Sequence, residues 1–167
     1  MTPDQKLFDF AQRELARIQS DLILRSEKGY QAFGIFDIKQ QHGLFEVYKN
    51  NEFCGEFSSA KVALSYCIAE RSHNYNLGIR LQHLDRHYVS ARNSVVSRKN
   101  MANTCRNNHT REILYSKIQH RRQQQHDLEN QLEDCVKMAK YLYLRGLNNE
   151  TQRIGCAAPT RTSRQSI

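Results

Sequence analysis

Residues 30–57, YQAFGIFDIKQQHGLFEVYKNNEFCGEF, decide the fold class, because their pattern differs from that of the rest of the chain. Aromatic and β-branched residues gather there in three short runs, AFGIFDI, GLFEVYK and EFCGEF. Polar residues at 40–43 and 50–51 separate these runs and are typical of turns. The stretch therefore predicts a small three-stranded antiparallel meander.

A helix is predicted directly after this meander. Ser58 is a candidate N-cap, and Phe57 and Val62 are placed to pack on each other as a hydrophobic staple. Residues 62–69 are apolar on nearly every side of the helix. We therefore expect this helix to be the most buried element and to pack on the sheet.

A further helix is predicted before the meander, over about residues 3–28. Thr2 is a candidate cap, Pro3 suits the first helical position, and Gly29 is a candidate terminator. Apolar residues recur between them at helical spacing, at Leu7, Ala11, Leu15, Ile18 and Leu22.

Two long seams of alternating 4,3 spacing follow the buried helix, and each is typical of a coiled coil. The first seam consists of Leu77, Leu81, Leu84, Tyr88, Ala91, Val95, Arg98, Ala102 and Cys105. The second consists of Leu114, Ile118, Arg121, Gln125, Leu128, Leu132, Cys135, Ala139 and Leu142, and it is followed by Gly146. The seams are apolar near the meander and polar where Arg98, Arg121 and Gln125 occupy them.

The phase of the apolar row is lost between the two seams, where residues 103–110 contain three Asn. A turn there would fold the two helices into an antiparallel hairpin. The alternative is one continuous helix in a parallel dimer, since no Gly or Pro interrupts residues 79–145. We favour the hairpin.

The predicted fold class is α+β, mainly helical, with the small meander packed on helices and a long antiparallel coiled-coil hairpin. The expected division is a small α+β domain over residues 1–76, the hairpin over residues 77–146, and a flexible basic tail over residues 147–167. The tail is assigned because it shows no apolar period.

The positive charge is concentrated in one part of the chain. The 167 residues carry a formal charge of +8, yet residues 1–89 have equal numbers of acidic and basic side chains. Residues 90–126 carry +7, with Glu112 as their one acidic residue. The candidate binding residues are the basic side chains of this stretch, namely Arg92, Arg98, Lys99, Arg106, Arg111, Lys117, Arg121 and Arg122.

Concentrated basic charge attracts polyanions, so these residues predict a nucleic-acid interface. Tyr115 is the one aromatic residue in the stretch, which gives little support to base stacking. An acidic protein partner, or assembly into a homo-oligomer through the hairpin, explains the same charge equally well.

No constellation of residues predicts catalysis or a cofactor. His83 and His87 have metal-ligand spacing but no third ligand, and they are typical of surface histidines. Cys67 and His73 could form a nucleophile pair, but Cys67 is expected to be a buried, inert thiol. Glycine-rich phosphate loops are absent from the sequence, so we expect a non-catalytic protein without cofactors.

The five cysteines are scattered and form no CxxC pair, which is typical of a reducing compartment. No apolar run is long enough for a membrane span, and mean hydropathy is −0.75. These features predict a cytoplasmic protein that does not enter membranes.

Two resemblances add to this interpretation. Residues 30–73 resemble the sheet-on-helix layout of AP2-type and phage-integrase arm-type DNA-binding domains, on residues that mostly serve packing, namely Tyr48, Gly55, Phe57, Ala60, Ala63 and Tyr66. Because the segment is not basic, base-reading roles are not carried over. The stretches GEFSSAKVALSYCIAE and AKYLYLRGLNNETQR resemble small uncharacterised proteins of T4-like tailed phages of marine bacteria. That resemblance implies a location in the host cytoplasm or the virion.

Overall fold

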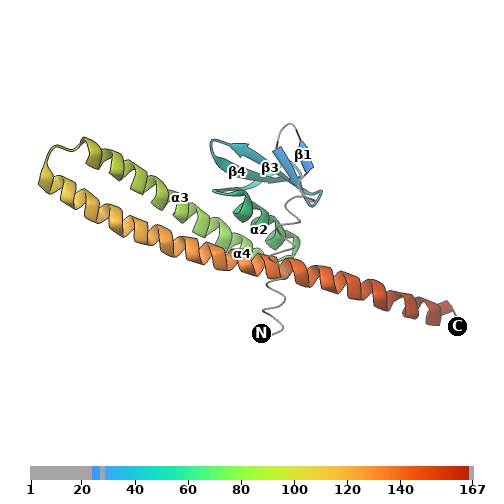
Figure 1. The fold of residues 1–167 in the computed structure, drawn as a ribbon. Coiled ribbons are helices and arrows are strands. Elements are labelled where there is room, and N and C mark those ends of the chain that lie inside the picture. The colour runs from blue at the N-terminus through green and yellow to red at the C-terminus, as the bar shows by residue number, and fades with distance from the viewer. Residues whose placement is uncertain (1–23, 27–28, 166–167) are drawn as a thin grey trace.

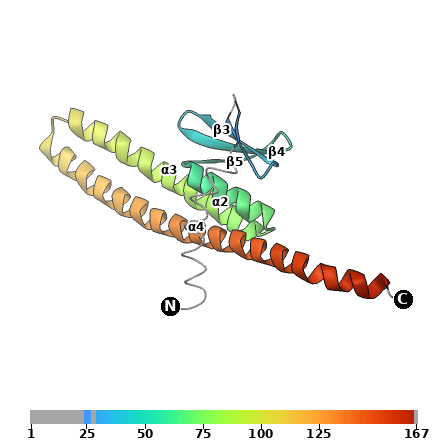
Figure 2. The same ribbon diagram turned by 45° about the vertical axis from the view of Figure 1, so that its right-hand side comes forward.

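The computed structural model describes residues 24–26 and 29–165, and this part of the chain is mainly helical with one antiparallel sheet (Figure 1). The sheet lies on helix α2, and α2 lies on a long hairpin of α3 and α4 (Figure 2). The elements are β1 (Leu24–Ser26), β2 (Gly29–Ala32), β3 (Phe36–Gln41), β4 (Leu44–Lys49), β5 (Glu52–Phe57), α2 (Ala60–Arg71), α3 (Tyr75–Thr104) and α4 (Asn108–Gln165).

The sheet is an antiparallel meander in the order β1-β2-β3-β4-β5, so the prediction of three strands is wrong. One predicted run is divided into β2 and β3 by a tight turn in which Phe33 and Gly34 have positive φ values of 55° and 69°. A short run of aromatic and β-branched residues does not reveal such a turn, because its only sequence signal is a single glycine.

The predicted helix over residues 3–28 is wrong at its end, because residues 24–26 form β1. Its other residues lie outside the described part of the chain. Gly29 does not terminate a helix but begins β2, with a φ of 145°. A Cβ atom at this position would lie 2.3 Å from the carbonyl oxygen of Ile38, so glycine lets β2 approach β3.

The main core lies between the sheet, α2 and the base of the hairpin. All residues of α2 from Val62 to Ala69 are buried, which confirms that it is the most buried helix. Its N-cap is Ser59 and not Ser58, because the Ser59 hydroxyl accepts a hydrogen bond from the backbone N–H of Val62. Ser58 is used elsewhere, as described below.

The long helices form an antiparallel hairpin, as predicted, and the continuous helix is wrong. Residues 105–107 connect α3 to α4. The Asn107 side chain caps α4 by accepting hydrogen bonds from the backbone N–H groups of His109 and Thr110. Every residue of both predicted seams is buried or half-buried, which confirms that the seams face the interior.

The main core is continuous between the predicted first and second domains. Leu77 and Leu81 of α3 and Leu132, Val136 and Ala139 of α4 belong to the same cluster as the buried residues of the sheet and α2. A boundary between residues 76 and 77 therefore does not separate two cores. A smaller second cluster, centred on Val95, Ala102 and Ile118, lies nearer the turn.

Helix α4 does not end near Gly146 but continues to Gln165, across most of the segment predicted to be a flexible basic tail. Gly146 is not among the glycines with positive φ. A glycine inside a helix costs only about 1 kcal/mol, which the neighbouring turns can offset. No helix in the described part of the chain has a stretch long and apolar enough to cross a lipid bilayer.

Candidate nucleic-acid interface at the hairpin end

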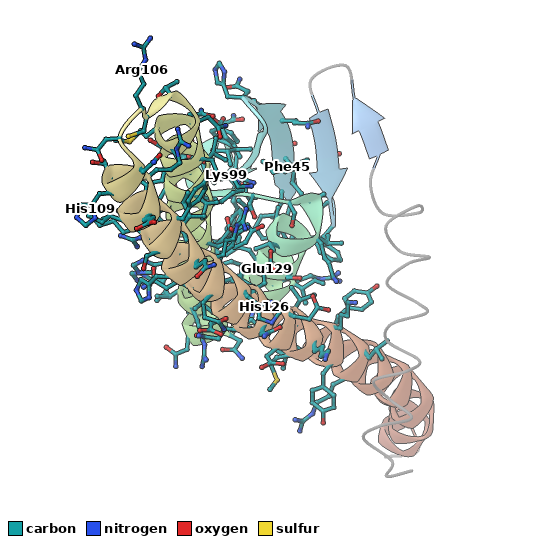
Figure 3. The ribbon with its side chains drawn as sticks, turned by 60° about the vertical axis from the view of Figure 1, so that its left-hand side comes forward. Phe45, Lys99, Arg106, His109, His126 and Glu129 are labelled. Carbon is teal, nitrogen blue, oxygen red and sulfur yellow. The ribbon has the colours of Figure 1, made fainter. Side chains whose placement is uncertain are left out.

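The hairpin brings the predicted basic residues of two sequence segments to one end of the molecule. We call residues 90–126 the basic end, and Figure 3 shows Arg106 and His109 at its turn. Four of the eight candidate residues are exposed, namely Lys99, Arg106, Lys117 and Arg122, and four are half-buried, namely Arg92, Arg98, Arg111 and Arg121.

Three of the half-buried arginines already have partners within the hairpin. Arg111 donates a hydrogen bond to the carbonyl of Cys105 and so holds the turn, although its Nε is buried without a partner among the described residues. Arg121 donates to the side-chain oxygen of Gln124 over 2.9 Å. The guanidinium of Arg92 lies 5.9 Å from the ring centre of Tyr88. The exposed four are therefore the best placed to reach phosphates.

The basic end is not neutralised by its own carboxylates. None of the eight basic side chains forms a salt bridge with another described residue. The ion pair between Lys61 and Glu133, at 3.2 Å, joins α2 to α4 in the neighbourhood of the main core. The positive field of the basic end is thus available to a ligand.

Exposed apolar side chains lie among these basic residues. Apart from Tyr115, the sequence analysis did not identify them. Val96, Met101, Ile113 and Tyr115 are each 45–55% exposed. They could not be identified from sequence, because a seam shows which side of a helix is buried but not how much of the neighbouring side is covered.

Asp85 is a second feature that the sequence did not reveal. Its side chain is 1% exposed, and its carboxylate accepts hydrogen bonds from the backbone N–H of Ser58 at 2.8 Å and from the Ser58 hydroxyl at 2.6 Å. Burial raises the pKa of Asp85, and the two bonds from Ser58 and the charge of Arg92 oppose the rise. Asp85 thus joins α3 to the link between β5 and α2.

We expect Asp85→Ala to lower the free energy of unfolding by about 1–3 kcal/mol, because the N–H of Ser58 would lose its acceptor. Asp85→Asn is the matched control, since it keeps an acceptor and removes only the charge.

Because the pKa of Asp85 is raised in the folded protein, the folded protein binds this proton more readily than the unfolded chain. The parent should therefore gain stability relative to Asp85→Asn as the pH falls from neutral to about 4. Urea unfolding of the three proteins across this pH range measures both effects, and a constant difference between parent and Asp85→Asn would contradict the raised pKa.

The histidines and the cysteine that the sequence suggested for metal binding or catalysis lie in different environments. His83 and His87 are exposed on α3, and the described residues include no group of three or more side chains placed to hold a metal ion. Cys67 is fully buried in α2, and burial raises the pKa of its thiol far above the usual range. His73 is exposed, with its Nδ1 3.1 Å from the hydroxyl of Tyr75. An inert thiol explains Cys67 better than a nucleophile.

Comparison with models of protein families, with curated protein sequences and with solved structures gave no match to this chain.

Proposed function

We propose that this protein is a non-catalytic binding protein that engages nucleic acid through the basic end of its hairpin. The observation that carries the proposal is the +7 charge of residues 90–126, held on a projecting pair of helices without salt bridges among the described residues. Phosphate groups that bind these side chains release condensed counterions, which supplies binding free energy without any base contact.

The geometry of the hairpin supports contacts that follow a nucleic-acid backbone. Lys99 lies on α3, Arg106 lies in the turn, and Lys117 and Arg122 lie on α4, so the exposed charge extends from the turn along both helices. Such contacts position a nucleic acid but carry no sequence information by themselves. The binding that we propose at this end is therefore independent of sequence.

An assembly role is the second candidate, because the basic end also exposes apolar side chains. Val96, Met101, Ile113 and Tyr115 would be covered if the hairpin docked on an acidic protein or on a second copy of the chain. In either role, the phage resemblance favours the host cytoplasm or the virion as the location.

Binding to a duplex DNA of random sequence, measured over a range of salt concentrations, tests the nucleic-acid proposal. If the four exposed basic side chains each reach a phosphate, the slope of log K against log salt should be about −3.6. Light scattering of the free protein tests the alternative. A salt-insensitive oligomer together with no DNA binding at about 50 mM salt would overturn the nucleic-acid proposal in favour of assembly.

A further inference from the structure

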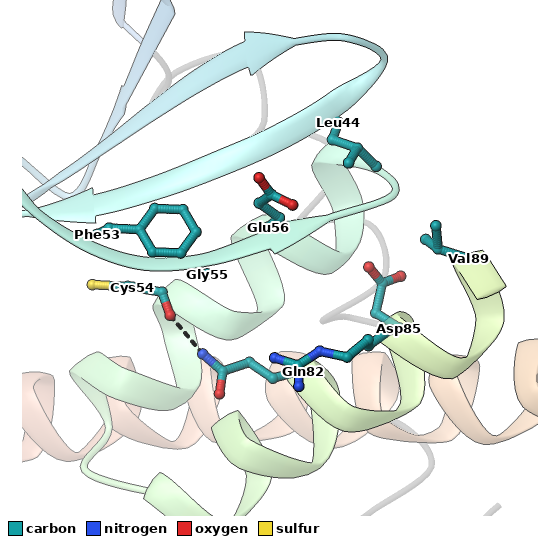
Figure 4. Close-up of a pocket in the computed structure, with 9 residues that line it drawn as sticks. Leu44, Phe53, Cys54, Gly55, Glu56, Gln82, Asp85 and Val89 are labelled. Atoms are coloured by element: carbon teal, nitrogen blue, oxygen red, sulfur yellow. Dashed lines mark hydrogen bonds between the residues drawn. The ribbon is translucent and has the colours of Figure 1, made fainter.

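Helix α3 packs along the free edge of β5 and is attached both to this strand and to the residue that follows it, and Figure 4 shows the first attachment, between Gln82 and Cys54. The side-chain amide of Gln82 donates a hydrogen bond to the carbonyl of Cys54 over 2.7 Å. Asp85 accepts the two bonds from Ser58. These attachments hold the strand edge and the helix at a defined separation, with residues 55–57 between them.

A cavity of about 350 Å³ opens between the two attachments. Leu44, Val89 and the ring of Phe53 supply apolar walls, while Glu56, Asp85 and Arg86 supply polar groups. Phe53 is 57% exposed, which is unusual for a phenylalanine. The volume is within the range of about 300–1,000 Å³ that is typical of small-molecule sites.

The backbone of Glu56 presents a donor and an acceptor to this cavity. In an antiparallel ladder, the N–H and C=O groups of successive residues point alternately toward the partner strand and away from it. Cys54 is the extra residue at a register shift in β5, so the alternation is regular only from Gly55 to Phe57. At the other end of this regular stretch, the N–H of Ser58 faces α3, because Asp85 accepts its hydrogen bond. Glu56 lies two residues before Ser58 and pairs in register with Glu46 of β4, so its own N–H and C=O face the same side as the N–H of Ser58.

The N–H and C=O of Glu56 are a hydrogen-bond donor and acceptor side by side, with apolar walls next to them. They are complementary to a planar group that carries an acceptor next to a donor. Nucleobases have this arrangement on their edges. The exposed carboxylate of Glu56 adds an acceptor, which favours bases with an exocyclic amino group. The cavity therefore favours cytosine, adenine or guanine over thymine or uracil.

The same side of α3 leads from this cavity to the basic end. Arg92 and Lys99 follow Asp85 at intervals of seven residues, and such spacing keeps side chains on one side of a helix. Arg86 lies at the cavity itself. Arg86 and Lys99 are exposed, so a strand whose phosphates contact these two side chains would have a base beside the cavity.

We infer that the cavity between β5 and α3 binds the base of an unpaired nucleotide, which deepens the proposed function and rests on it. The backbone of Glu56 reads the edge of the base, Phe53 and Val89 contact its faces, and the cations of α3 hold the adjoining phosphates. Free mononucleotides and single strands both supply this chemistry, and the cations along α3 favour a strand.

Binding of three single strands of equal length and charge tests this inference, with oligo-dC, oligo-dT and an abasic sugar-phosphate strand as the probes. A bound base contributes on the order of fivefold or more in affinity. Oligo-dC should therefore bind at least about fivefold more tightly than the abasic strand, with oligo-dT between them. Equal affinity for all three strands would overturn the inference and leave the proposed phosphate binding intact.

Val89→Trp fills the cavity and should abolish the preference for oligo-dC while leaving the affinity for the abasic strand unchanged. Ile79→Trp is the matched control, because Ile79 also lies on α3, is exposed, lies outside the basic end and does not line the cavity. The control should keep the preference. A preference that survives in a folded Val89→Trp would place the base elsewhere.

Titration of the parent with cytidine monophosphate separates the two sources of the base. Much weaker binding of the mononucleotide than of oligo-dC supports a strand, whereas equal binding assigns the cavity to free nucleotides. If no strand binds, the proposed function is wrong. The cavity inference is then tested by cytidine monophosphate alone, and it is overturned if the mononucleotide does not bind either.

Discussion

Replacing Arg98, Lys99, Arg121 and Arg122 by Gln is expected to reduce the affinity for duplex DNA by at least about 100-fold at about 50 mM salt. At that salt concentration, each phosphate contact contributes roughly tenfold through counterion release. Two of the four side chains, Lys99 and Arg122, are exposed, and two are half-buried in the seam. At least two contacts are therefore removed, and the slope of log K against log salt should flatten by about 0.9 for each lost contact. Fluorescence anisotropy at several salt concentrations measures both quantities.

A matched control removes the same number of charges from exposed residues outside the basic end, namely Lys49, Arg71, Arg80 and Lys137. This variant has the same net charge as the first but should keep most of the DNA affinity and the original slope. Equal losses in the two variants would show that binding depends on net charge and not on the basic end. The double variant of Lys99 and Arg122 separates exposed charge from changes in seam packing, and circular dichroism confirms the helical content of each protein.

Leu132→Ala is expected to lower the free energy of unfolding by about 2–5 kcal/mol. Leu132 is 6% exposed and belongs to the core cluster that also contains buried residues of the sheet and α2. Its truncation should therefore destabilise the sheet and the base of the hairpin together, in one cooperative transition. Leu128→Ala, one turn earlier on α4 and half-buried, should cost less.

Urea unfolding followed by far-ultraviolet circular dichroism and by tyrosine signals measures whether the helices and the core respond together. An unchanged midpoint for Leu132→Ala would contradict its place in the core. Two separate transitions would instead support independent units on either side of residue 76.

The seams and α2 could be predicted from sequence because each repeats a simple rule many times. A period of 3.5 over about four heptads identifies a buried row, and polar residues at 103–110 identify the turn. The number of strands could not be predicted in the same way, since the boundary between β2 and β3 depends on one short turn at Phe33 and Gly34. β1 depends on pairing with β2, which no local pattern shows.

Part of the candidate site could likewise be predicted from the sequence, and part could not. The accumulation of charge over residues 90–126 is a property of the sequence and needs no coordinates. Asp85 looks like any other acidic residue of an exposed helix, and only the position of Ser58, 27 residues earlier, explains its burial. The cavity beside it likewise depends on how α3 crosses the edge of β5, and such tertiary placement is not encoded in any short motif.

Helix α4 is long enough to extend beyond the main core in both directions. Its 58 residues extend about 87 Å at about 1.5 Å per residue, with its first turns in the basic end and its last turns beyond the sheet (Figure 1). Between these ends, the helix packs into the main core through Leu132, Val136 and Ala139. The two ends of the helix therefore extend away from the core on opposite sides, so partners that bound at the two ends would be held up to about 87 Å apart, with α4 as the spacer between them.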